Sequence, residues 1–101
     1  MSNAKSNFGK SIIYKIVCKD LQIKDVYVDS TRNLAARIAA HKHWAKNPEH
    51  QLAKDRLLYS TVDANLGWDN WTVVFIERYP CADQYELHAR VRYWIEQLGQ
   101  T

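Results

Sequence analysis

The chain of 101 residues has room for one hydrophobic core, and its composition, 47% apolar and 25% charged, is that of an ordinary globular domain. No apolar run approaches the ~20 residues of a membrane-spanning helix, and the N-terminus lacks a secretion signal, so we expect a cytoplasmic or nuclear protein. A net charge of +3 is too small for a histone-like protein or a basic tail, so the position of the charges matters more than their sum.

The N-terminal segment 1–10 is polar, and its first four residues resemble an expression-vector remnant. We expect it to be disordered or tag-derived, which leaves a single domain over 11–99. The two cysteines, Cys18 and Cys81, form neither a C-x-x-C pair nor a zinc-binding spacing. We therefore interpret both as free thiols that act as small hydrophobic side chains.

The first half of the chain reads as two strands and a helix. β-branched and aromatic residues predict a β-hairpin from 11–18 and 25–29, joined by a polar connection. Ser30 and Thr31 offer hydroxyl caps for a helix that we predict over 32–44, where apolar residues recur at helical spacing among alanines.

A second helix is predicted to begin at Asn47-Pro48-Glu49 and to continue to about Asn65. Asparagine can cap the free amides, proline presets φ at the first position, and the acid suits the positive end of the helix dipole. A strand over 70–79 stops at Pro80. A last helix, ended by Gly99, carries an apolar stripe at i, i+4, i+7, i+8 and i+11, formed by Leu87, Val91, Trp94, Ile95 and Leu98.

These elements follow one another in the order β-β-α-α-β-α. No internal repeat, low-complexity tract or Pro/Gly-rich linker interrupts them. The predicted fold class is therefore α+β, with a three-stranded antiparallel sheet flanked by helices.

Basic residues concentrate in and around the first predicted helix. No acid precedes Glu49 in this stretch, which contains Arg32, Arg37, His41, Lys42, His43, Lys46 and His50. Such a surface suits a partner that carries phosphate groups, although a solvated helix face explains it equally well.

Several motifs occur together in one order along the chain. Tyr14 follows two isoleucines in the first strand, Tyr27 begins Tyr-Val-Asp in the second, and Arg37 and His41 stand four apart on the first helix. With the Tyr-Trp-Ile of the last helix, this constellation resembles the GIY-YIG nucleases over nearly all of 11–98. It looks closest to short stand-alone members found in phage-like, viral and mobile-element settings.

The resemblance implies hydrolysis of a DNA phosphodiester with one divalent ion, Mg²⁺ or Mn²⁺, held by a single glutamate on the last helix. In the family the two tyrosines orient or activate the attacking water, and the arginine and histidine address the scissile phosphate. Carried over by position, the catalytic residues are Tyr14, Tyr27, Arg37 and His41. The residues expected to bind phosphate are Arg32, Arg37, Lys42 and Lys46.

Each of these side chains also has a structural interpretation. Tyrosines at the edge of a core are common, with the ring buried and the hydroxyl at the surface. A helix-surface arginine or histidine is equally common. We prefer the functional interpretation because the two tyrosines, the arginine and the histidine occur together in the family's order.

Three positions depart from the family pattern. Ile12 replaces the first glycine, which is mild because isoleucine suits a strand. Asp29 replaces the glycine of the second motif, shares a strand face with Tyr27, and would repel a nearby phosphate by a few kcal/mol. Val91 replaces the glutamate and has no donor atom for a metal ion, so the Lewis acid is lost.

We therefore expect a GIY-YIG-like domain with impaired catalysis that retains weak DNA binding. One alternative is an active endonuclease in which Asp29, or a partner protein, supplies the metal ligand. Another is a protein-interaction or structural module that keeps only the fold. The sequence itself sets neither an oligomeric state nor a target sequence, and it does not separate DNA from RNA.

Overall fold

The computed structural model describes residues 8–99, which form the predicted α+β fold. The strands are β1 (Ile12–Cys18), β2 (Val26–Thr31) and β3 (Trp71–Arg78), and the α-helices are α2 (Leu34–Lys46), α3 (Arg56–Ala64) and α4 (Gln84–Leu98). Short 3₁₀ turns lie at η1 (Pro48–His50), η2 (Ala53–Asp55) and η3 (Trp68–Asn70). No helix among the described residues is long and apolar enough to cross a membrane.

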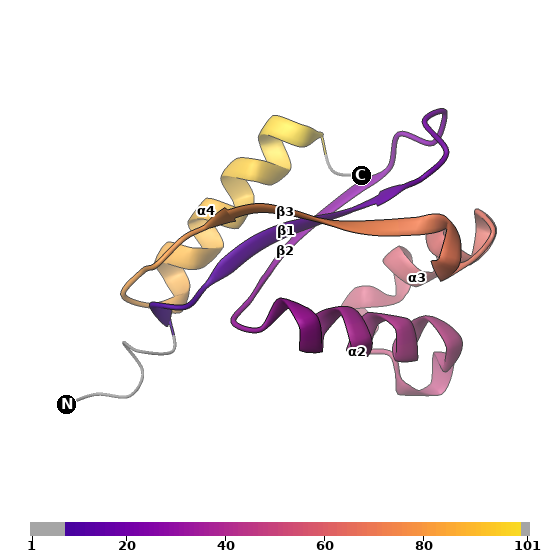
Figure 1. The fold of residues 1–101 in the computed structure, drawn as a ribbon, viewed down its shortest axis with the longest axis horizontal. Coiled ribbons are helices and arrows are strands. Elements are labelled where there is room, and N and C mark those ends of the chain that lie inside the picture. Colours follow the sequence, from indigo (N-terminus) through magenta and orange to yellow (C-terminus); the bar gives the residue numbers. More distant parts are fainter. Residues whose placement is uncertain (1–7, 100–101) are drawn as a thin grey trace.

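The sheet is antiparallel throughout, with β1 in the centre and the strand order β2-β1-β3. Helix α4 covers one face of this sheet, and α2 and α3 lie on the other (Figure 1). In the register, Tyr14 of β1 lies opposite Asp29 of β2 and opposite Phe75 of β3. Side chains alternate between the two faces along each strand, so these three residues share one face.

Each face of the sheet carries its own core. The core under α2 and α3, called here the α2/α3 core, consists of Tyr14, Ile16, Cys18, Tyr27, Leu58, Tyr59, Val62 and Trp71. The core under α4, called here the α4 core, has Ile13, Val28 and Leu87 at its centre. The predicted apolar stripe of α4 packs against it through Val91, Trp94, Ile95 and Leu98.

The start of α2 differs from the prediction. Ser30 and Thr31 belong to the end of β2, and the cap is Asn33, whose Oδ1 accepts a hydrogen bond from the Ala36 amide at 3.0 Å. The helix therefore begins two residues later than expected. An extended Ser30-Thr31 continues the pairing with β1, and an asparagine caps at least as well as a hydroxyl.

The predicted helix from Pro48 to Asn65 is also wrong in part. Pro48 begins only a 3₁₀ turn, after which Gln51 and Leu52 are extended and α3 starts at Arg56. Asn47 does not cap this turn, because its side-chain amide instead donates to the His43 carbonyl at 2.7 Å. Contacts with the end of α2 therefore outweighed the local helix-start pattern.

Helix α4 follows its local signals. Asp83 caps its first turn by accepting from the Glu86 amide at 2.9 Å, and Gly99 ends it at φ 68°. Cys18 is buried and Cys81 half-buried, and both are free thiols, as predicted.

The segment expected to be disordered or tag-derived lies mostly in 1–7, outside the described residues. Within its described part, Phe8 packs against the α4 core, and its carbonyl accepts from the Ser11 amide at 3.3 Å.

Candidate functional site

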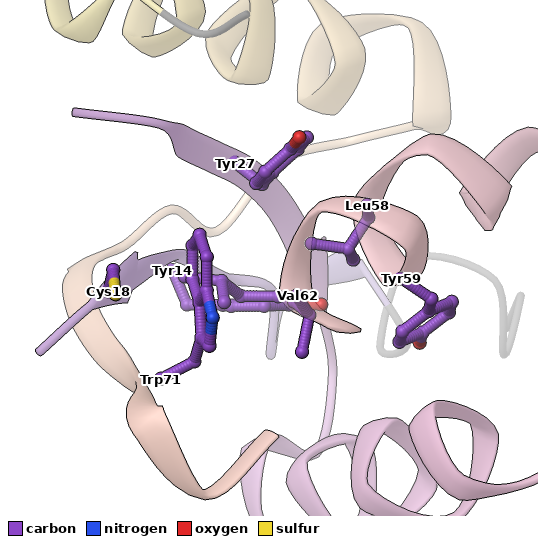
Figure 2. Close-up of a cluster of buried hydrophobic side chains, with 8 residues drawn as sticks. Tyr14, Cys18, Tyr27, Leu58, Tyr59, Val62 and Trp71 are labelled. Atoms are coloured by element: carbon purple, nitrogen blue, oxygen red, sulfur yellow. The ribbon is translucent and has the colours of Figure 1, made fainter. Parts of the chain in front are cut away.

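Three buried side chains from three elements form a continuous hydrogen-bonded chain. His41 of α2 lies between Tyr14 of β1, whose hydroxyl is 2.9 Å from Nε2, and Tyr59 of α3, whose hydroxyl is 2.6 Å from Nδ1. Figure 2 shows the two tyrosines entering the α2/α3 core from the sheet and from helix α3. The Trp68 ring stacks on the imidazole at a centroid distance of 5.6 Å. The orientation of the imidazole is therefore fixed on several sides.

The imidazole of His41 is neutral at physiological pH. Burial lowers its pKa to about 4, and the positive charge of Arg37 adds to this effect, while Asp29 opposes it. A neutral imidazole has one N–H donor and one acceptor nitrogen, which matches a position between two hydroxyls.

Tyr14 is also held in its neutral form. Burial raises the pKa of its hydroxyl, and the charge of Asp29 raises it further. Arg37 opposes both effects through its charge and through a hydrogen bond to the phenol. Burial likewise raises the pKa of Tyr59. At neutral pH neither phenol is a proton acceptor of useful strength, and both can donate a hydrogen bond.

Asp29 forms an ion pair with Arg37. Its carboxylate oxygen Oδ2 lies 3.8 Å from Nη1 of Arg37, and Oδ1 accepts from the Ser30 amide at 2.8 Å. Both charged side chains keep about a third to a half of their surface exposed, 34% for Arg37 and 45% for Asp29. The pair is therefore open to solvent, and Asp29 shares a face of β2 with Tyr27, as predicted.

Tyr27 does not join the chain of hydrogen bonds around His41. Its hydroxyl donates to Thr61 of α3 at 3.0 Å and points away from Tyr59 (Figure 2). Its ring nevertheless lines a cavity of about 150 Å³ together with Asp29 and His41. Asp55, at the start of α3, faces the same cavity, and burial raises the pKa of its carboxyl.

A larger groove connects the arginines to α4. Arg32 and Arg37 line this groove of about 610 Å³, called here the arginine groove, and Leu87 and His88 line it from α4. Val91 follows Leu87 by one helical turn on the same side of α4 and packs in the α4 core. Val91, to which the resemblance assigns the family's glutamate position, therefore holds an apolar side chain that packs in the α4 core.

The basic residues of α2 do not form one surface. Arg37 and Lys46 are about 180° apart around the helix axis. Lys46 lines a different groove of about 820 Å³, which lies beside α3 and includes Arg56. Lys42 is exposed. Of the four residues expected to bind phosphate, the structure thus brings together Arg32 and Arg37 and places Lys46 elsewhere.

The residues present do not fit the one-glutamate metal centre. Val91 has no donor atom, and the nearest candidate for a replacement, Asp29, is already paired with Arg37. Within residues 8–99, no group of three or more His, Cys, Asp and Glu side chains is placed to hold a metal ion.

The sheet with a tyrosine on each of two neighbouring strands, followed by a helix that carries arginine and histidine, defines the class of GIY-YIG nuclease-like domains. The family model described as GIY-YIG catalytic domain matches residues 10–100, and the chain belongs to this family. GIY-YIG nucleases bind DNA and generally use a divalent metal ion. No curated protein and no solved structure that was compared with the chain matches it significantly.

The sequence alone did not reveal three residues of this region: Tyr59, Thr61 and His88. Tyr59 was detectable only as one more apolar position on a helix, next to Leu58. Its partner His41 lies 18 positions away on another element, and no periodicity connects them.

Proposed function

We propose that this chain is a nucleic-acid-binding GIY-YIG domain that does not by itself hydrolyse phosphodiesters efficiently. One observation carries the proposal: Val91, to which the resemblance assigns the glutamate position, packs with Ile13, Val28 and Leu87 in an apolar core. A side chain without a donor atom cannot hold the cation on which hydrolysis in this family depends.

The phosphate-binding part of the site keeps the necessary chemistry. A guanidinium binds phosphate oxygens bidentately, and Arg37 is exposed enough to reach them. Arg32 lines the same groove and adds a second positive charge. Tyr14 is fully buried and stays protonated at neutral pH, so its hydroxyl is not available as a base for hydrolysis.

Asp29 weakens this binding from inside the site. Its carboxylate lies 3.8 Å from the guanidinium that a phosphate would approach, so the phosphate competes with an internal anion. At such a distance in a surface-like dielectric, two charges interact by a few kcal/mol before screening by salt. The proposed affinity is therefore low and strongly dependent on salt.

A second candidate is an active endonuclease in which Asp29 replaces the glutamate. The observation in its favour is that Asp29 lines one cavity with Tyr27 and His41, with Asp55 facing the same space. Against it stands the ion pair with Arg37, which a bound cation would have to disrupt.

Nicking of supercoiled plasmid in Mg²⁺ or Mn²⁺ separates the two candidates. We expect no metal-dependent nicking by the parent and a gain of nicking in Val91→Glu. Val91→Gln is the matched control, because glutamine has the shape of glutamate without its negative charge. Nicking by the parent that is abolished in Asp29→Asn would refute the proposal and establish the relocated ligand.

Retention of the protein on immobilised duplex DNA at increasing salt tests the binding step. We expect Arg37→Gln to weaken retention and to lower the salt slope by about one phosphate contact, while Lys46→Gln, on the other side of α2, has a smaller effect. Asp29→Asn should strengthen retention. A parent that shows no salt-dependent retention would instead favour the protein-interaction or structural module.

A further inference from the structure

The imidazole of His41 has to donate one hydrogen bond and accept the other. It is neutral at physiological pH and 3% exposed, and a hydroxyl lies within hydrogen-bonding distance of each ring nitrogen. Two arrangements satisfy this geometry. Either Tyr59 donates to Nδ1 and Nε2–H donates to Tyr14, or both bonds run in the opposite direction.

The two distances favour one direction. Hydrogen bonds donated by a hydroxyl are typically shorter than those donated by a ring N–H, whose usual length is about 2.9 to 3.0 Å. The contact between Tyr59 and Nδ1 is 2.6 Å, and that between Tyr14 and Nε2 is 2.9 Å. The shorter contact therefore suits a hydroxyl donor, and the longer one suits an imidazole donor.

We infer that Tyr59 is a positioning residue that donates its hydroxyl proton to Nδ1 of His41 and thereby fixes the imidazole as the Nε2–H tautomer, which donates to Tyr14. Nothing in the local sequence around Tyr59 indicates this role, because the contact joins α3 to α2. The stacked ring of Trp68 holds the imidazole plane in the orientation that both bonds need.

The direction of these bonds determines what Tyr14 can do. Its oxygen accepts from Nε2–H of His41. Its own proton is then left for a further acceptor. In the opposite arrangement Tyr14 gives that proton to His41 and has no donor left.

The Tyr14 side chain is 0% exposed, so a phosphate of nucleic acid does not reach this proton in the folded protein. The assignment of the tautomer does not depend on the proposed function. The tautomer is a property of the free protein and can be measured without any ligand.

Nitrogen-15 NMR of the histidine ring in the uniformly labelled full chain tests the inference at pH 7. In the parent we expect the His41 proton on Nε2 and an Nδ1 resonance typical of an unprotonated nitrogen that accepts a hydrogen bond. In Tyr59→Phe we expect the Nδ1 resonance to move toward that of an unprotonated nitrogen without a bonded donor. Tyr27→Phe is the matched control, because it removes a buried hydroxyl from the same core and should leave both His41 resonances in place.

A His41 proton found on Nδ1 in the parent would overturn the inference, and this result does not depend on whether Tyr59→Phe folds. An Nδ1 resonance that is the same in the parent and in a folded Tyr59→Phe would overturn it as well. Since no nucleic acid is added, failure of the proposed binding function would leave these outcomes unchanged.

Discussion

Acid should destabilise this domain through the single buried imidazole of His41. The pKa of this group is lowered from 6.5 to about 4 by burial and by Arg37. Between these two values the unfolded chain binds a proton that the folded chain excludes. Unfolding therefore becomes easier as the pH falls through this window, and the contribution of His41 is constant above pH 6.5.

The size of the effect follows from the shift. Each pKa unit corresponds to about 1.4 kcal/mol, so the full change is about 3 kcal/mol. A small domain has a total stability of about 5 to 15 kcal/mol, so this loss is a large share of it. Glu77, whose pKa is lowered by Arg90 and Trp94, adds a further loss at lower pH. The contribution of His41 to the pH dependence of stability must therefore be isolated by comparing the parent with a His41 variant.

Urea unfolding followed by tryptophan fluorescence between pH 7.5 and 4.5 measures this dependence. We expect His41→Gln to be less stable than the parent at pH 7 and to lose less stability between pH 6.5 and 4.5. His88→Gln removes an exposed histidine of α4 and should keep the parent's slope. Equal slopes for the parent and His41→Gln would refute the reasoning, as would a His41 pKa near 6.5 in an NMR titration of the folded protein.

Three further changes test local features of the fold. Asn33→Ala removes the cap of α2 and should cost about 1 kcal/mol in urea unfolding, with Asn33→Ser restoring most of it. Gly99→Ala places a side chain at φ 68°, and we expect it to cost about 1 kcal/mol; no loss would show that α4 ends differently in solution. Glu77→Gln should lower the thermal midpoint and change the fluorescence of Trp94, because Glu77 accepts from the Trp94 indole at 2.6 Å and from Arg90 at 2.6 Å; an unchanged emission spectrum would argue against this network.

The ion pair between Arg37 and Asp29 relates the departure at Asp29 to the one at Val91. In the function that we propose, the site holds no metal ligand at Val91, and without Asp29 the guanidinium of Arg37 would face no anion until substrate arrives. The carboxylate at 3.8 Å provides one within the chain itself. Restoring a metal ligand at Val91 without removing this carboxylate would leave an internal competitor, so Val91→Glu combined with Asp29→Gly should cut better than Val91→Glu alone.

The sequence by itself determined the fold class, the order of elements and the C-terminal end of α4. Period-two and period-3.6 hydrophobic patterns are local, and so are the signals that ended α4 at Gly99. It also placed Asp29 on the same strand face as Tyr27, because strand alternation requires no tertiary information. The caps at Ser30 and Asn47 were predicted wrongly because pairing with β1 and a contact with His43 outweighed the local pattern.

Only the tertiary structure decided the chemistry of the site. The buried chain of hydrogen bonds joins Tyr14, His41 and Tyr59, which come from three elements far apart in sequence. Burial, which no short motif encodes, holds His41 as a neutral imidazole at physiological pH. The desolvation of a group depends on everything that packs around it, so its charge state is a property of the whole fold, whereas periodicity is a property of the chain.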